Sequence, residues 1–212
     1  MAVARLGLTD GDDAAVGLAF FRAHGDVYVA AGLGIVAMAV ALTVAVIGLD
    51  EALAERASRV ARRSVAACGF FAAACLAAAG AVQVGAPGPV LRIAEIDAAD
   101  GRAAYLVVHL VGVQGAYAAG LLAVSGWVVG ICVLAGRSRL LPAPLVWLGV
   151  IPAVRVLIGL FGPLLDGAPD ALFVLYLAGA VGVNLWVLIA GAVLARAAHG
   201  RTVRPGSLGP GG

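Results

Sequence analysis

Five apolar stretches constrain this chain more than any other feature. They cover residues 26–49, 64–84, 105–135, 141–165 and 171–195. Each can cross the hydrocarbon layer of a bilayer, which is about 30 Å thick and takes about 20 residues of α-helix. A backbone in lipid must satisfy its own hydrogen bonds, so apolar stretches of this length form helices. The sequence therefore predicts an all-α, polytopic membrane helix bundle with five transmembrane helices.

The composition agrees with this class. Hydrophobic residues make up 63% of the 212 residues and charged residues only 12%, which leaves too little polar surface for a soluble domain of this size. The net charge of +2 comes from scattered arginines and indicates no nucleic-acid partner. Cys68, Cys75 and Cys132 lie inside apolar stretches, where we expect neither disulfides nor a metal site. We expect the lipid bilayer as a partner, and no cofactor.

Arginines predict the orientation, because short cytoplasmic loops retain positive charge. With five spans, one side holds nine arginines: Arg56, Arg59, Arg62, Arg63, Arg137, Arg139, Arg196, Arg201 and Arg204. The other side holds most of the acidic residues. We therefore expect the amino terminus outside and the carboxyl terminus in the cytoplasm. No signal peptide is expected in the first eight residues, so the first span would direct insertion.

The spans divide the chain into three parts. These are an outer N-terminal segment (residues 1–25), a five-span transmembrane domain (26–196) and a disordered cytoplasmic tail (197–212). Within the domain, the link over residues 50–63 is predicted to be a helical extension. Residues 90–97 are predicted to form a plain loop, with a short interfacial helix as the alternative.

Three features suggest irregularities within the spans. The third stretch is longer than a bilayer needs, so we expect it to tilt, to project into the cytoplasm, or to bend near Ser125 and Gly126. Pro152 is expected to kink the fourth helix, and Gly162 with Pro163 to end it. Small residues at four-residue spacing predict close helix contacts. They are Gly112, Ala116 and Gly120, then Gly69, Ala73 and Ala77, then Ala37, Ala41 and Ala45.

Residues 137–151, of sequence RSRLLPAPLVWLGVI, resemble a bacterial family of small multi-span membrane proteins that carry a domain of unknown function. The resemblance extends over residues 26–196 and includes a final helix containing Asn184, Leu185 and Trp186. Members of that family usually have six spans. The resemblance therefore implies that the first of the six is missing here, and that residues 1–25 correspond to an outer loop. It fits a multi-pass protein of the bacterial inner membrane and implies no established activity.

Apart from Asp26 at the very start of the first stretch, Arg155 is the one charge inside any of the five stretches. A charge at the centre of a spanning helix costs about 3 kcal/mol on insertion scales, so the Arg155 side chain needs a stabilising partner or a polar environment. Structural solutions are snorkelling, an ion pair with Asp166, Asp170 or Glu95, or a bond to the carbonyl freed by Pro152. The functional solution is a bound anion or lipid headgroup. Both stay open from the sequence.

Polar side chains gather in the outer halves of the predicted helices. His109 and Gln114 lie about 6 Å and about 14 Å below the outer end of the third helix, and Arg155 about 15 Å below that of the fourth. We therefore predict an outward-facing polar cavity. Its candidate ligand-binding residues are Arg155, His109, Gln114, Asn184, Tyr105 and Tyr176.

The same residues also have structural interpretations. His109 alone is more often a hydrogen-bond donor between helices than a ligand-binding group. Gln114 and Asn184 are expected to join neighbouring helices. Trp127, Trp147 and Trp186 are expected to act as packing or interfacial anchors.

No catalytic residues are predicted. Ser125 lies about 24 Å from His109 along the same helix, too far for a serine–histidine pair. We therefore expect no enzyme activity. One hypothesis is that the protein binds or moves a small anionic or amphiphilic ligand. The alternative is an accessory or structural membrane subunit without a ligand of its own. Homo-oligomers or a membrane protein partner are compatible with both.

Overall fold

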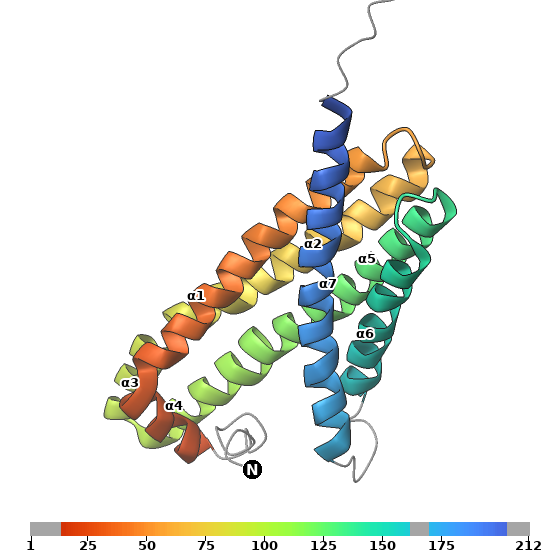
Figure 1. The fold of residues 1–212 in the computed structure, drawn as a ribbon. Helices are drawn as coiled ribbons and strands as arrows, with labels where there is room; N and C mark the ends of the chain where they lie inside the picture. Colours follow the sequence, from red (N-terminus) through yellow and green to blue (C-terminus); the bar gives the residue numbers. More distant parts are fainter. Residues whose placement is uncertain (1–13, 162–169, 203–212) are drawn as a thin grey trace, which may run out of the picture. The chain divides into compact units, whose positions relative to one another are not determined.

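The computed structural model describes residues 14–161 and 170–202, with the side chains of the last helix described only in part. Every secondary-structure element in these ranges is a helix, which confirms the predicted all-α class (Figure 1). Three helices are long and apolar enough to cross a membrane: α1 (Ala14–Ala52), α2 (Arg59–Gly85) and the continuous helix Ala98–Arg137. Two further apolar helices are α6 (Ala143–Phe161) and α7 (Asp170–Thr202). Each predicted span thus corresponds to one helix.

Helix α1 begins well before the predicted start of the first span. Its backbone leaves helical geometry at His24 (φ −140°, ψ 31°), two residues before that predicted start. The preceding part lies in the predicted outer segment and packs through Leu18 and Phe21 against Val90 and Tyr105. The segment before the break is therefore an ordered helix whose apolar face is buried.

The link after α1 corrects one prediction. Residues 53–58 form a turn, so the expected helical extension of the span is wrong over this part. The Arg62 guanidinium donates hydrogen bonds to the main-chain carbonyl and to the carboxylate of Asp50, the latter over 3.2 Å. This pair joins the end of α1 to the start of α2. A continuous helix would hold the two residues far apart, because they are separated by more than three turns.

Residues 90–96 are helical, so the predicted plain loop is wrong and a short helix forms, as in the alternative; its interfacial position stays a prediction. Helix α3 (Pro87–Ile96) starts on a proline, which suits a first turn because its missing N–H has no partner there. Asp97 then begins α4 (Ala98–Leu106), its carboxylate accepting hydrogen bonds from the Ala99 and Asp100 amides over 2.6 and 3.0 Å. These two bonds hold the pKa of Asp97 below its usual value.

The third predicted span is one continuous helix in three parts: α4, the π-helix η1 (Val107–Gly115) and α5 (Ala116–Arg137). Its departure from α geometry lies in η1, whereas α5 is regular through Ser125 and Gly126, where a bend was expected. Helix α6 also continues through Pro152. The expected stop at residues 162–163 and most of the predicted tail, residues 203–212, lie outside the described part of the chain.

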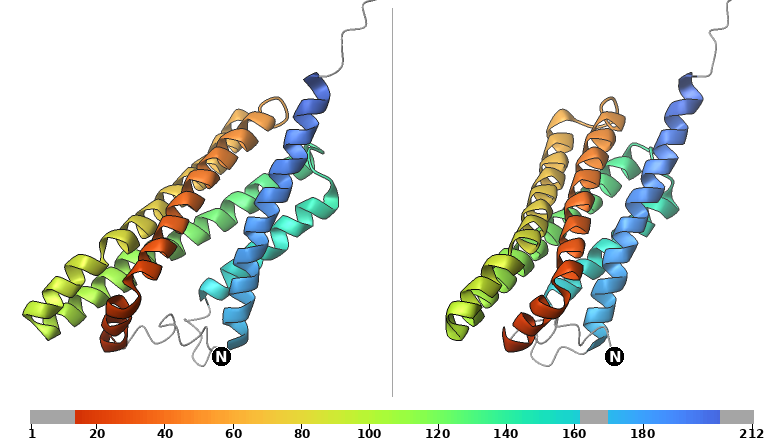
Figure 2. Two further views of the ribbon diagram at one scale, coloured as in Figure 1. Left: turned by 60° about the vertical axis from the view of Figure 1, so that its left-hand side comes forward. Right: turned by 90° about the vertical axis from the view of Figure 1, so that its left-hand side faces the viewer.

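The chain forms two compact units. Unit 1 comprises Met1–Val46 and Ala66–Trp127, and unit 2 comprises Ile47–Val65 and Val128–Gly212. In unit 1, α1 and α2 run side by side in both views of Figure 2. They approach most closely at Gly32 and Gly80, where a Cβ built on Gly80 would lie 2.7 Å from the Gly32 carbonyl oxygen. The two glycines therefore set the spacing of these helices.

The small-residue prediction is only partly correct. Gly69 and Ala73 are buried, and Gly120 faces Leu76 closely. Ala37 and Ala41 are exposed, however, so the predicted stripe on the first helix is wrong. Four-residue spacings occur on every face of an alanine-rich helix, so the pattern alone does not identify the face that packs. The contact forms where both backbones lack a side chain.

In unit 2, α6 and α7 pack against each other. The indole N–H of Trp186 donates to the Leu145 carbonyl over 2.8 Å, and Gly149 leaves room for the indole. This confirms the packing role predicted for Trp186. At the second contact, Gly179 on α7 lies against the backbone of α6 beside Pro152 and Arg155. Glycine again permits close approach of two helices.

Helix α5 ends in a hydrogen-bonded turn of the Schellman type. The Leu140 amide donates to the Ala135 carbonyl over 2.9 Å and the Arg139 amide to the Gly136 carbonyl over 3.2 Å. Arg139 has φ 53°, the left-handed conformation that this turn requires and that glycine adopts most readily. Within the described ranges it is the one non-glycine residue with positive φ.

The Gly32–Gly80 contact generates a first prediction. Gly80→Ala should lower the free energy of unfolding by about 1–3 kcal/mol, because the added methyl group overlaps the Gly32 backbone. Gly34→Ala is the matched control, since nothing lies within 4 Å of its added methyl group. This variant should be unchanged or up to about 1 kcal/mol more stable, by helix propensity. Thermal unfolding of both variants in the same detergent measures the difference, and equal stabilities would contradict the contact.

Candidate functional site

The polar residues predicted in the third span gather on the π-helix η1 of unit 1. The side-chain nitrogens Nε2 of His109 and Gln114 lie 2.9 Å apart, within hydrogen-bonding distance. Residues five apart do not face each other on an α-helix, where neighbours are three or four apart. The i→i+5 geometry of a π-helix brings them together. Sequence reasoning identified both residues but missed the backbone geometry that pairs them.

Aromatic rings extend this polar pair toward α1. The Tyr105 and His109 rings stack with centroids 5.3 Å apart. The Phe21 ring meets the Tyr105 ring edge-on, with centroids 5.2 Å apart, and the Phe21 and Tyr28 ring centroids are 4.7 Å apart. We call these residues, with Gln114, the unit 1 polar cluster. Phe21 and Tyr28 were not predicted to belong to it, because each is an apolar or interfacial residue when taken alone.

Two buried polar atoms of the unit 1 polar cluster have no hydrogen-bond partner within the described part of the chain. They are Nδ1 of His109 and the hydroxyl oxygen of Tyr28. His109 is only 4% exposed. With the Gln114 amide as donor, its Nε2 accepts, so Nδ1 carries the proton. A buried donor without a partner costs about 1–3 kcal/mol, so this N–H needs an acceptor.

The hydrogen bonds of Gln83, Gln114 and Asn184 show which amides connect helices. The Gln83 amide of α2 donates to the Tyr28 carbonyl of α1 over 3.2 Å, so it joins two helices. Gln114 pairs within its own helix, and the exposed Asn184 amide donates over 2.9 Å to the Ala180 carbonyl one turn earlier. The expectation that these last two amide nitrogens join neighbouring helices is therefore wrong. In lipid, the nearest free acceptor of a surface amide is its own helix.

Arg155 is exposed on α6, in unit 2. Among the side chains that the structure describes, its guanidinium forms no ion pair. The side chains of Asp166 and Asp170, two of its predicted partners, and of Tyr176, a predicted site residue, lie outside the described part of the structure. Tyr105, His109 and Gln114 thus come together in unit 1, while the predicted cavity that adds Arg155, Asn184 and Tyr176 stays a prediction.

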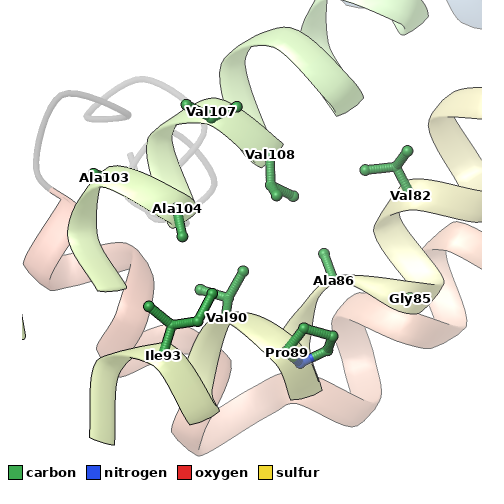
Figure 3. A pocket seen from close by; sticks show the side chains of 10 residues that line it. All are labelled: Val82, Gly85, Ala86, Pro89, Val90, Ile93, Ala103, Ala104, Val107 and Val108. Carbon is green, nitrogen blue, oxygen red and sulfur yellow. The ribbon is translucent and has the colours of Figure 1, made fainter. Parts of the chain in front are cut away.

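An apolar groove lies in unit 1, on another face of the continuous α4–η1 helix that carries His109. Figure 3 shows its walls, with Val82 and Ala86 facing Ala104 and Val108. The groove has a volume of about 590 Å³ and is also lined by Val90. Every side chain on its walls is apolar, so it offers hydrocarbon contacts and no hydrogen bond. His109 does not line it, so the groove and the polar cluster are distinct features.

The His109–Gln114 pair generates the second prediction. Gln114→Leu should lower the free energy of unfolding by about 1–3 kcal/mol, because it leaves a second nitrogen of His109 unpaired. Combined with His109→Leu, it should cost less than the sum of the two single changes, with a coupling of about 0.6–1.5 kcal/mol. Asn184→Ala is the control and should change stability by less than about 0.5 kcal/mol. Additive effects of the paired variants in thermal unfolding would contradict the bond.

Comparisons with known proteins place the chain in a family. No curated protein matches it, and no solved structure does. A family model described as "Domain of unknown function (DUF4386)" matches residues 1–191, which is most of the chain. The match includes all helices of unit 1, as well as α6 and most of α7. The chain belongs to the DUF4386 family.

Proposed function

We propose that this protein binds a small amphiphilic molecule through the unit 1 polar cluster. The observation that supports this function is the Nδ1 of His109, which is buried and has no hydrogen-bond partner among the residues that the structure describes. A ligand oxygen from a hydroxyl, carbonyl or carboxylate group would accept its proton and remove the cost of burial. The Tyr28 hydroxyl is a second group in need of a partner.

The proposed ligand is apolar apart from this polar group. The Tyr105 ring stacks on His109, and Phe21 and Tyr28 extend this aromatic surface away from it, which favours hydrocarbon or aromatic parts of a ligand. Arg155, the predicted source of positive charge for an anionic ligand, belongs to unit 2, and recognition by the unit 1 polar cluster does not depend on it.

We propose binding or movement of the ligand, not catalysis. The hydroxyl of Ser125 is buried on the same helix as His109, sixteen residues further on. This spacing corresponds to about 24 Å along a helix, which prevents general-base catalysis between them.

The third prediction tests ligand binding by removing the polar group of one side chain at a time. Wild type, Tyr28→Phe, His109→Phe and the control Tyr117→Phe are purified in one mild detergent, and retained small molecules are measured by mass spectrometry. We expect a retained molecule in wild type and control. Retention should fall about fivefold or more in the first two variants, as expected for one lost hydrogen bond of about 1 kcal/mol.

For Tyr28→Phe, thermal stability should not fall as ligand retention does. After exhaustive washing, Tyr28→Phe should unfold at the same temperature as wild type or higher, because the removed hydroxyl has no hydrogen-bond partner in the described part of the chain. Equal retention by all four proteins would contradict the proposal. So would the absence of any small molecule together with one membrane protein copurified in fixed ratio, the result that favours an accessory subunit.

We further propose that the amino terminus faces outward and the carboxyl terminus the cytoplasm of a bacterial inner membrane. This orientation is supported by the nine arginines predicted on one side. The fourth prediction follows: alkaline phosphatase fused after residue 212 should be inactive in cells, and a fluorescent protein at the same site should fluoresce. An active phosphatase fusion would reverse the orientation.

A further inference from the structure

A second cavity lies in unit 2, where α5 turns into α6. It has a volume of about 600 Å³ and is lined by residues 136, 139–143, 146 and 147. The Schellman turn contributes Arg139, and the first turns of α6 contribute Ala143, Val146 and Trp147. None of these residues belongs to the unit 1 polar cluster, so the cavity is independent of the proposed function.

The cavity combines apolar walls with an arginine. Leu140, Val146 and the indole of Trp147 supply apolar surface, and the exposed Arg139 supplies a positive charge. Trp147 is 63% exposed, whereas Trp127 and Trp186 are fully buried. An exposed tryptophan near the end of an apolar helix is typical of the boundary between headgroups and acyl chains.

The charge of this turn is not balanced locally. Arg137 and Arg139 lie within three residues of each other, and the sequence holds no aspartate or glutamate between Arg102 and Asp166. The start of α6 adds the positive end of a helix dipole to the same cavity. An anionic group is therefore the complementary partner.

We propose that this cavity binds an anionic phospholipid of the bilayer. Its phosphate contacts the Arg139 guanidinium, with Arg137 adding long-range attraction, and the first part of an acyl chain lies along Val146 and Trp147. The apolar walls favour a lipid over a free anion, because a soluble phosphate would leave them exposed to water. The left-handed conformation of Arg139 fixes the point at which its side chain leaves the turn.

The fluorescence of Trp147 offers a direct test. The purified full-length chain is mixed with phosphatidylglycerol or phosphatidylcholine carrying brominated acyl chains, which quench nearby tryptophans. Since Trp127 and Trp186 are fully buried, quenching reports on Trp147, and Trp147→Phe should abolish it. Wild type should be quenched at an about fivefold lower proportion of phosphatidylglycerol than of phosphatidylcholine, as expected for one arginine at an anionic headgroup.

Two variants separate this site from general charge attraction. Arg139→Gly suits the left-handed backbone and should fold as well as wild type, but it should lose the preference for phosphatidylglycerol. Arg139→Asn is a second neutral variant that tolerates this conformation. Arg63→Ala removes the same charge from the exposed side of α2 and should keep the preference.

Four results would overturn the proposal. Wild type could show equal quenching by both lipids. Arg63→Ala could lose the preference as fully as Arg139→Gly, which would indicate attraction by net charge. Inorganic phosphate, added at matched ionic strength, could remove the preference, which would indicate a site for free phosphate. Retention of the preference in both Arg139→Gly and Arg139→Asn would likewise exclude the Arg139 contact.

Discussion

The structure depends on one constraint, which is that polar groups in hydrocarbon must find partners inside the protein. The backbone meets it by forming helices over most of the described ranges. Side chains meet it less completely. Gln83 and Trp186 donate hydrogen bonds to carbonyls of neighbouring helices, while Asn184 donates to a carbonyl of its own helix. His109 satisfies one nitrogen through Gln114, and its other nitrogen has no partner among the described residues. The unit 1 polar cluster combines this incomplete pairing with a stacked aromatic ring, that of Tyr105.

Much of the fold could be predicted from the sequence because length and hydropathy are summed over many residues. A stretch of more than 20 apolar residues has few alternatives to a spanning helix. The elements that sequence reasoning misjudged depend on contacts between distant residues. The turn after α1 forms because Arg62 reaches Asp50, and α3 is helical because Val90 and Ala94 pack against Leu18 and its neighbours. Neither contact leaves a signal in local periodicity.

The candidate site was predictable as a set of residue types but not as a geometry. His109 and Gln114 attract attention because polar side chains are rare in apolar stretches. Their spacing of five residues argues against a contact when α-helical periodicity is assumed, and only the π-helical backbone reverses that conclusion. The Phe21 contribution was missed for another reason. Its segment lies outside the predicted spans, and its packing becomes visible only with α3 and α4 in place.

At Arg139, the energetic cost of the backbone conformation can be compared with the gain from the side chain. A non-glycine residue in the left-handed conformation costs about 1–2 kcal/mol. A glycine at this position, a residue type of which the chain contains 30, would avoid this cost. The turn itself therefore does not account for an arginine at this position. The turn hydrogen bonds of Leu140 and Arg139 satisfy carbonyls in the last turn of α5 and offset this cost in the backbone. The proposed contact of the Arg139 side chain with an anionic headgroup is worth about 1 kcal/mol near a membrane surface, so it adds a separate gain of comparable size.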